Sequence, residues 1–221
     1  MPRNSSLVPP RPLIVATANP GKLHEFRALL AGLPFELHSL GELGLSSPEE
    51  TGADFLENAM LKARHAAAAA AGWAGTAGSG ENIAAMADDS GLEVDALGGA
   101  PGVFSARYAG VGSDDAANNA KLLKALAGTP AERRRARYRC ALVLVFGATD
   151  PAPLIAEGVW EGVILDAPRG GGGFGYDPYF WLPELGVTAA QLSLEDKNRL
   201  SHRGIALRAL RDRLHGPAMR S

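Results

Sequence analysis

The segment between Pro12 and Leu30 constrains the fold most, because a buried strand there leads directly into a helix. "PLIVATA" (12–18) is a short apolar, β-branched run between turn residues, which is typical of a buried strand. In the "NPGK" that follows, Asn19 is a favourable N-cap and Pro20 suits the first helical position. A strand that enters a helix through so short a turn indicates an α/β protein.

The rest of the chain continues the alternation of strand-like and helix-like segments. Further strands are expected over 35–40, 83–87, 136–148 and 153–165, and further helices over 51–71, 114–128 and 194–214. The strand over 83–87 is expected to end at an acidic pair, and Thr51 with Asp54 resembles a capping box for the helix over 51–71. This pattern predicts an α/β fold with an elongated mixed β-sheet, flanking helices and two lobes.

Neither an internal repeat nor a break in composition divides the chain, so residues 12–215 are predicted to form a single two-lobed domain. Several prolines break any helix near the start, and residues 1–11 are expected to form a disordered tail. The segment 72–82 is rich in Gly and Ser, and we expect it to be a mobile loop.

The composition excludes several classes of function. With 46% hydrophobic and 21% charged residues and a formal net charge of −2, the chain has no general electrostatic attraction for nucleic acid or an anionic membrane. No apolar stretch reaches the roughly 18–20 residues of a membrane span, and the N-terminus lacks the apolar core of a signal peptide. Cys140 is the only cysteine, which rules out an internal disulfide and fits a reducing compartment. A cytoplasmic location is therefore expected, with no nucleic-acid or membrane partner.

The turn after the first strand is a candidate phosphate-binding site. A helix N-terminus that follows a buried strand presents free backbone N–H groups and a positive dipole. Thr17 and Asn19 add side-chain donors and Lys22 adds a positive charge, although the spacing of a Walker loop is absent. The alternative interpretation is an ordinary helix cap with a surface lysine.

Two acidic pairs are candidate metal ligands or bases. In an extended segment Asp88 and Asp89 point to opposite faces, so one is expected to face a site while the other hydrogen-bonds the local turn. Glu49 and Glu50 precede the helix over 51–71, where the helix dipole favours acids in any case. One carboxylate from each pair suffices for Mg²⁺, which takes its other ligands from water and substrate. The alternative at each pair is a plain turn or cap.

The glycine-rich segment "GGGGFGYDPYF" (170–180) is a candidate binding turn for a flat ring. Its glycines allow a close backbone approach. Phe174 would stack on the ring while Asp177 accepts a hydrogen bond from it. The alternative is a glycine-rich turn whose aromatic residues pack in the core.

The segment "LEDKNRLSHRG" (194–204) carries donors suited to carbonyl or phosphate oxygens, namely Lys197, His202 and Arg203. On one continuous helix these side chains do not all share a face. Ser201 can instead end one helix and cap a second. The alternative is a solvated helix face.

Five motifs occur in an order and spacing that together resemble one known family: "TANPGKLHEF", "EETGADFLENAMLKARHAA", "ADDSGLEVDALGGAPGVFSARYAG", "GGFGYDPYF" and "LSLEDKNRLSHRGIALRAL". This is the Ham1/RdgB family of inosine-triphosphate pyrophosphatases, and the resemblance extends from Leu13 to Leu214. It implies an α/β fold with the active site in a central cleft between two lobes, usually in a homodimer. It also implies Mg²⁺-dependent hydrolysis of dITP, ITP and XTP to the monophosphate and pyrophosphate, which keeps these noncanonical purine nucleotides out of DNA and RNA.

The resemblance further assigns the site residues. Asp89 matches the general base and a metal ligand, and Glu49, the first acid of "EETG", matches a second metal ligand. The positions that match substrate contacts are Thr17, Ala18, Asn19, Pro20, Gly21 and Lys22 in the triphosphate turn, Ser90 beside the acid, Phe174, Gly175, Tyr176 and Asp177 in the nucleoside turn, and Lys197, His202 and Arg203 near the C-terminus. The tail 1–11 and the long segment 72–82 depart from the family pattern without touching these motifs.

Physical chemistry agrees with such an activity. Displacement at the α-phosphorus needs an activated water, neutralised charge and a bound leaving group, for which a carboxylate base, Mg²⁺ and Lys22 are suited. Hypoxanthine and xanthine present an O6 acceptor where adenine presents an amino donor. A donor at His202 or Arg203 would therefore pair with O6 and be left unpaired by adenine, at a cost of about 1–3 kcal/mol.

Three other functions remain open. A metal-dependent phosphomonoesterase would release orthophosphate, and a nucleotide-binding regulator would bind without turnover. An RNA-binding module would use "ERRRARYR" (132–139). In that run arginines alternate with Ala136, Tyr138 and then Cys140, which is the period of a strand with one solvated face, and the net charge disfavours RNA.

Overall fold

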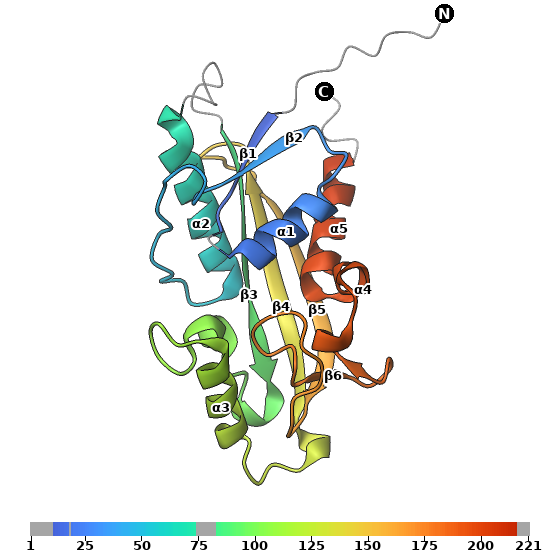
Figure 1. Cartoon of the computed structure of the whole chain (residues 1–221). Helices are drawn as coiled ribbons and strands as arrows, with labels where there is room; N and C mark the ends of the chain where they lie inside the picture. Colours follow the sequence, from blue (N-terminus) through green and yellow to red (C-terminus); the bar gives the residue numbers. More distant parts are fainter. Residues whose placement is uncertain (1–10, 18, 74–82, 216–221) are drawn as a thin grey trace, which may run out of the picture.

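The computed structural model describes residues 11–17, 19–73 and 83–215. Its strands are β1 (Arg11–Val15), β2 (Phe35–Ser39), β3 (Ala84–Val94), β4 (Arg135–Val145), β5 (Leu154–Ile164), β6 (Phe180–Leu182) and β7 (Val187–Thr188). Together they form one seven-stranded sheet in the order β2-β1-β3-β4-β5-β6-β7 (Figure 1). Pairing is parallel among β2, β1 and β3 and antiparallel from β3 to β7, so the sheet is mixed as expected.

The helices are α1 (Pro20–Leu29), α2 (Phe55–Ala69), α3 (Asp115–Ala125), α4 (Leu194–Leu200) and α5 (His202–His215). Short 3₁₀ segments include η3 (Asp95–Leu97) and η4 (Gly102–Arg107). Among the described residues, no helix is both long and apolar enough to cross a membrane.

The alternation of side chains along the strands divides the core into two layers. Ala85 and Ala87 of β3 pack with the alanine-rich face of α2, whereas Met86 of the same strand packs on the opposite side of the sheet with α1 and α5. Small side chains on α2 let its axis lie close to the strands. Figure 1 shows α2 on one side of the long strands and α1 and α5 on the other.

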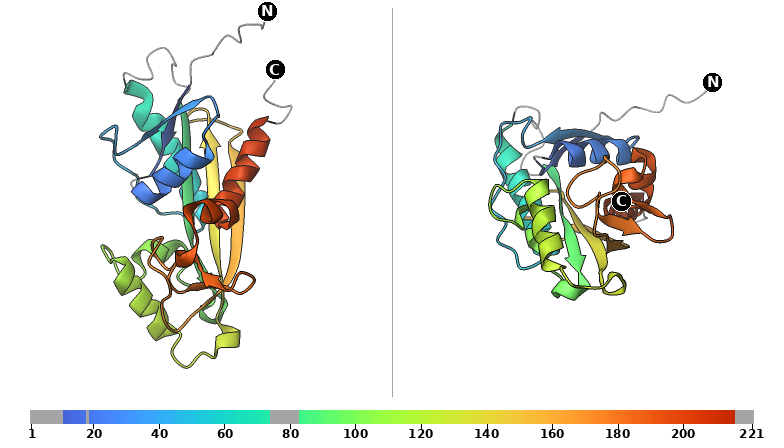
Figure 2. Two further views of the ribbon diagram at one scale, coloured as in Figure 1. Left: turned by 45° about the vertical axis from the view of Figure 1, so that its right-hand side comes forward. Right: turned by 60° about the horizontal axis from the view of Figure 1, so that its bottom comes forward.

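The molecule has two lobes that share the long strands β3, β4 and β5. At one end these strands carry β1, β2, α1, α2 and most of α5, and at the other they carry α3 and β6 (Figures 1 and 2). A third apolar cluster fills the second lobe, with Leu92, Leu122, Trp160 and Phe180 among its members. The predicted elongated, two-lobed α/β architecture is confirmed.

The first strand differs from its predicted range. It was expected over 12–18, but β1 begins at Arg11 and ends at Val15. The described part of the predicted tail 1–11 is thus Arg11 alone, which pairs with Phe35, and residues 1–10 lie outside the described part of the chain. Most of the predicted loop 72–82 also lies outside the described ranges.

The prediction that a strand over 83–87 ends at the acidic pair is wrong. β3 continues to Val94, and Asp88 and Asp89 lie opposite Leu142 and Ala141 of β4. The strand continues because Leu92 and Val94 are fully buried in the second lobe. The chain leaves the sheet only at η3, which is followed by Gly98 in the left-handed region (φ 62°).

Two helix boundaries also differ from the sequence pattern. Thr51 does not cap α2; the cap is Asp54, whose Oδ1 accepts the N–H of Glu57 (2.8 Å). Glu57 reaches back to accept the N–H of Ala53 (2.8 Å), so the start of α2 is stabilised one turn later than predicted. The C-terminal segment forms two helices, because Ser201 ends α4 and its Oγ accepts the N–H of Gly204 (3.2 Å) at the start of α5.

Candidate active site

A cavity of about 170 Å³ lies between the two lobes. Ten of the predicted site residues line it, namely Asn19, Lys22, Ser90, Phe174, Gly175, Tyr176, Asp177, Lys197, His202 and Arg203. Six further lining residues were not predicted: Gly91, Ser105, Ala106, Asp115, Asn118 and Tyr138. Segments from both ends of the chain thus meet at one site. Asp89 and Glu49 are not among the lining residues, and Ala18 lies outside the described residues.

The turn before α1 is capped by its own side chains. Oδ1 of Asn19 accepts the N–H groups of Gly21 (2.8 Å) and Lys22 (3.2 Å), and Oγ1 of Thr17 accepts the N–H of Asn19 (3.1 Å). Two of the N–H groups that the sequence suggested were free are therefore occupied by the cap. The positive group that this turn presents at the cavity is the Lys22 ammonium, 2.9 Å from Asp88.

Asp88 is the buried centre of an ion cluster. Its Oδ2 lies 2.9 Å from Lys22, 3.2 Å from Nη2 of Arg203 and 3.1 Å from the hydroxyl of Ser90. Burial by itself would raise the pKa of Asp88, but Lys22 and Arg203 hold it well below the usual range. The expectation that one acid of the pair would hydrogen-bond a local turn is wrong, because the strand continues through both residues and no turn exists there.

The ion cluster continues through Arg203 to the C-terminal helices. Arg203 is only 1% exposed and also pairs with Glu25 of α1, which lies 3.8 Å from the ammonium of Lys197. Sequence reasoning missed Glu25. The available signal was its position one helical turn after Lys22, on the same face of α1.

Asp177 organises the 174–177 turn. Its Oδ2 accepts hydrogen bonds from Lys197 (2.6 Å) and from the N–H of Phe174 (3.0 Å), and its Oδ1 accepts one from Tyr138 (3.3 Å). Both oxygens are therefore engaged by the protein rather than open toward the cavity. The Lys197 ammonium lies 4.5 Å from the centre of the half-buried Phe174 ring and makes a cation–π contact with its electron-rich face.

Asp89 faces away from Asp88, toward α2, which confirms the opposite-face prediction for the pair. Its Oδ1 lies 2.8 Å from Lys62 and its Oδ2 accepts from Asn58 (3.2 Å). Burial raises the pKa of Asp89, and the attraction of Lys62 only partly offsets this effect. Sequence reasoning missed Lys62 and Asn58, although a polar i, i+4 pair on an alanine-rich, buried helix face is a usable signal.

The two glutamates before α2 have different surroundings. Glu50 accepts from Lys62 (2.9 Å) and from Arg107 (2.9 Å), so the ammonium of Lys62 lies between Glu50 and Asp89. Glu49 is exposed, and no ion pair is recorded for it among the described residues. Glu49 is the acid of this pair that is free to receive another cation.

His202 is buried against aromatic rings. Its imidazole stacks on Tyr138 at 4.8 Å with an interplanar angle of 10°. Burial, assisted by Arg203 and Lys197, lowers its pKa well below the usual value, so the ring is neutral at pH 7. Its Nδ1 has no hydrogen-bond partner among the described residues.

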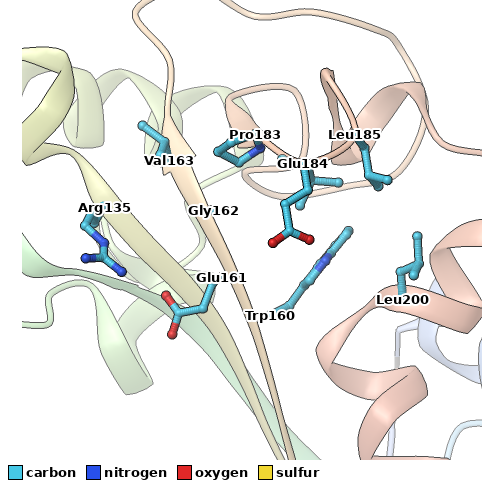
Figure 3. Close-up of a pocket in the computed structure, with 10 residues that line it drawn as sticks. Arg135, Trp160, Glu161, Gly162, Val163, Pro183, Glu184, Leu185 and Leu200 are labelled. Atoms are coloured by element: carbon cyan, nitrogen blue, oxygen red, sulfur yellow. The ribbon is translucent and has the colours of Figure 1, made fainter.

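A second hollow, of about 410 Å³, lies between β5, the β6–β7 segment and the end of α4. Figure 3 shows Trp160, Leu185 and Leu200 around it, with Glu161 and Glu184 beside them. None of the predicted site residues lines this hollow. The interlobe cavity is therefore the candidate active site.

Fold and site together define a class: an α/β protein with a polar interlobe cleft, of the kind that binds phosphorylated ligands. Comparison with known proteins is more specific. The chain belongs to the Ham1 family, whose model matches residues 13–213.

Close relatives cover nearly the whole chain. A dITP/XTP pyrophosphatase of Xanthomonas campestris pv. campestris (strain 8004) is 54% identical over 92% of this chain and 96% of its own. One of Pectobacterium atrosepticum is 50% identical over 91% of this chain and 97% of its own.

Solved structures show the same fold. A Ham1 protein from Coxiella burnetii is 44% identical, with a TM-score of 0.81 over 93% of this chain and 98% of that protein. The Staphylococcus aureus Ham1 protein is 38% identical, with a TM-score of 0.78 over 93% of this chain and 99% of its own. The family resemblance of the five sequence motifs is confirmed.

Proposed function

We propose that this protein hydrolyses the noncanonical purine nucleotides dITP, ITP and XTP between their α- and β-phosphates, giving the nucleoside monophosphate and pyrophosphate. The observation that carries this proposal is the 54% identity, across 92% of the chain, to a relative named dITP/XTP pyrophosphatase. In this role the enzyme removes such nucleotides from the pool before polymerases incorporate them into DNA or RNA.

The nucleoside half of the substrate is proposed to bind at the 174–177 turn. Phe174 borders the cavity and stacks on the base. Because the guanidinium of Arg203 is engaged by Asp88, Glu25 and Ser90, it positions the site rather than reading the base. The donors for O6 are the neutral imidazole of His202 and the backbone N–H groups of His202 and Arg203 at the start of α5, since Ser201 already accepts the N–H groups of Gly204 and Ile205.

The phosphate half is proposed to bind at the turn formed by residues 17–22, with Ala18 and the Lys22 ammonium contacting the leaving pyrophosphate. Lys22 and Ser90 both border the cavity. Lys22 is already held in place by Asp88. A lysine fixed by a buried carboxylate needs little reorganisation when a phosphate group arrives, which favours charge stabilisation in the transition state.

The acidic side chains of the segment before α2 and of the α2-facing side of β3 are proposed to hold a Mg²⁺ ion. Asp89 and Glu50 hold the ammonium of Lys62 between them, so carboxylate oxygens from these two segments converge here. The described residues contain no group of three or more metal-binding side chains, but Mg²⁺ bound with a nucleotide needs only one or two carboxylates. We assign Asp89 and the exposed Glu49 as its protein ligands. When bound, Mg²⁺ neutralises phosphate charge and acidifies a water molecule.

Asp89 is proposed as the general base. A buried carboxylate with a raised pKa is a better proton acceptor than an ordinary aspartate, and the salt bridge to Lys62 (2.8 Å) favours its ionised form. Asn58 and Lys62 orient its two oxygens. Asp89 therefore accepts a proton from the attacking water as the bond to the α-phosphorus forms.

The proposed working form is a homodimer in the cytoplasm, in line with the family resemblance. Size-exclusion chromatography with light scattering tests the dimer directly. A monomer at micromolar concentration would contradict this part of the proposal without affecting the reaction.

The reaction is tested with purified full-length protein, Mg²⁺ and dITP, ITP, XTP, ATP or GTP, with pyrophosphate and orthophosphate quantified separately. We expect pyrophosphate from dITP, ITP and XTP and little product from ATP or GTP. Equal turnover of ATP would overturn the specificity. Orthophosphate as the first product would indicate a phosphomonoesterase, and tight binding without turnover would indicate a regulator.

A further inference from the structure

Both backbone polar groups of Gly175 are held by side chains of α3, from the opposite side of the cavity. Oδ2 of Asp115 accepts the N–H of Gly175 (2.6 Å), and Nδ2 of Asn119 donates to its C=O (2.9 Å). We call this pair of contacts the Gly175 clamp. Gly175 has a positive φ of 62°, a conformation that glycine adopts freely and that contacts outside the turn can therefore select.

The orientation of Asn119 is fixed even though one of its atoms is left unpaired. Its Nδ2 donates to both the C=O of Gly175 and the C=O of Asp115 (2.8 Å), while its buried Oδ1 has no hydrogen-bond partner among the described residues. Turning the amide over would place that oxygen against two carbonyl oxygens. The structure thus tolerates a buried unpaired acceptor in order to keep the donor on Gly175.

The clamp lies next to the residue that is proposed to stack on the base. Phe174 precedes Gly175, and its N–H is bound by Asp177, which α4 holds through Lys197. Asp177 is held by Lys197 of α4 and Tyr138 of β4, and the Tyr176 hydroxyl donates to the C=O of Ser105 (2.7 Å). The α3 contacts are those that hold the backbone of Gly175, the residue directly after Phe174. Without them, this backbone is free to move and the Phe174 ring moves with it.

We propose that Asp115 and Asn119 are positioning residues that set the place of the Phe174 ring and thereby the affinity for the nucleoside half of the substrate. This inference rests on the proposed assignment of residues 174–177 as the nucleoside-binding turn. Asp115 borders the cavity, whereas Asn119 is not among its lining residues. An effect of Asn119 on binding is therefore transmitted through Gly175.

The chain offers a matched control in the residue before Asp115. Asp114 is the N-cap of α3, with Oδ1 accepting the N–H of Ala117 (2.8 Å), and it makes no recorded contact with the turn. Asp114→Ala thus removes one negative charge and weakens the helix start, as Asp115→Ala does, but it leaves the clamp intact. Asp115→Asn keeps an acceptor oxygen for the Gly175 N–H and is expected to rescue function.

The experiment measures kcat and KM for dITP in wild type, Asp115→Ala, Asp115→Asn, Asn119→Asp and Asp114→Ala. In Asn119→Asp a carboxylate faces two carbonyl oxygens, which opens the clamp without changing side-chain size. We expect Asp115→Ala and Asn119→Asp to raise KM by about tenfold, with kcat changed less than about twofold. The first variant loses a charge-assisted hydrogen bond, and the second replaces a neutral hydrogen bond by repulsion between a carboxylate and a carbonyl oxygen. Asp115→Asn and Asp114→Ala stay near the wild-type KM.

Inhibition by pyrophosphate, the product that carries no base, separates the two halves of the substrate. The inhibition constant of pyrophosphate is measured from the rate at which the nucleoside monophosphate forms. It should be the same in wild type and in both clamp variants. A parallel weakening of pyrophosphate binding, a fall in kcat at constant KM, or an equal KM effect in Asp114→Ala would overturn the inference. Phe174→Ala tests the underlying assignment: an unchanged KM there refutes the nucleoside turn itself, whereas a raised KM with inert clamp variants refutes only the clamp.

Discussion

At the scale of single residues, the neighbouring carboxylates of Asp88 and Asp89 have opposite electrostatic surroundings, because successive side chains of a strand point to opposite faces. Asp88 meets Lys22 and Arg203, and its pKa is held down. Asp89 meets Lys62 and Asn58 on the other face of β3, and burial raises its pKa. The first carboxylate is stabilised as an anion and suits a structural role, whereas the second retains basicity and suits catalysis.

Asp89→Asn should lower kcat by about 10²–10⁴-fold, because the proton acceptor is lost. Stability should change little, since the raised pKa means that ionised Asp89 does not stabilise the fold and Lys62 keeps Glu50 as a partner (2.9 Å). Steady-state kinetics and thermal unfolding of the same preparation check both statements. In wild type, kcat should also fall as the pH drops through the raised pKa of Asp89, above the ordinary aspartate value of about 3.9. An Asp89→Asn variant with the wild-type kcat would exclude Asp89 as the base.

Of the two glutamates before α2, Glu49 is expected to bind the metal and Glu50 to stabilise the fold. Glu49→Gln should raise the Mg²⁺ concentration for half-maximal rate by about tenfold without loss of stability, because Glu49 is exposed. Glu50→Gln should instead lower the unfolding temperature, because it weakens the pairs with Lys62 and Arg107. Mg²⁺ titrations of both variants are the measurement. If only Glu50→Gln changed the Mg²⁺ requirement, the ligand assignment would pass to Glu50.

At the scale of elements, the close approach of α5 to β5 sets the position of His202 and Arg203. A Cβ on Gly158 of β5 would overlap the backbone C=O of His202 and would lie 2.8 Å from the N of Ala206. These neighbours are backbone atoms, which cannot rotate away as a side chain can. The absence of a side chain at Gly158 therefore allows the first turn of α5 to lie against the sheet beside the cavity.

Gly158→Ala should displace the first turn of α5, cost about 1–3 kcal/mol of stability and raise KM for dITP. Gly72→Ala is the matched control, because a Cβ there meets no atom within 4 Å. Urea unfolding and kinetics on both variants check the prediction. Loss of stability without a change in KM would show that α5 shifts without carrying His202 and Arg203 with it.

At the scale of the whole molecule, a buried ion cluster joins segments that are distant in sequence. Its anions are Asp88, Glu25 and Asp177, and its cations are Lys22, Arg203 and Lys197. Members come from α1, β3, α4, α5 and the 174–177 turn, so the cluster links both lobes beside the cavity. Removing one partner from such a cluster leaves an uncompensated buried charge.

This cluster predicts the acid sensitivity of the fold. Because the folded pKa of Asp88 lies below its unfolded value of about 3.9, ionised Asp88 stabilises the protein above that pH, and this contribution is lost as the pH falls below it. Asp88→Asn should lower the free energy of unfolding by about 3–5 kcal/mol at pH 7. In this variant the free energy of unfolding should also fall less steeply at acidic pH than in wild type. Urea unfolding between pH 7 and pH 3 measures both effects, with Asp212→Asn on the exposed side of α5 as control. An equally steep fall in Asp88→Asn and in wild type would contradict the assignment.

Several features were predictable from local sequence because local chemistry produces them. The Asn19 cap, the Pro20 start of α1 and the Ser201 break arise from side chains that bond backbone within a few residues. The opposite faces of Asp88 and Asp89 follow from strand geometry alone. Ten of the predicted site residues line one cavity. They were predicted together because the five motifs resemble those of a known family, and no local sequence pattern connects these distant positions.

What the tertiary structure decided was which partners these residues meet. The run of β3 past the acidic pair depended on buried Leu92 and Val94 in the second lobe. Glu25, Lys62 and Asn119 received their roles from contacts 20 or more residues away along the chain: with Arg203, Asp89 and Gly175 respectively. By itself the sequence determined most of the elements, the caps at Asn19 and Ser201 and the identity of the chemical groups. Only folding decided which carboxylate is neutralised and which stays basic, because a charge acquires its pKa from neighbours that long-range packing brings to it.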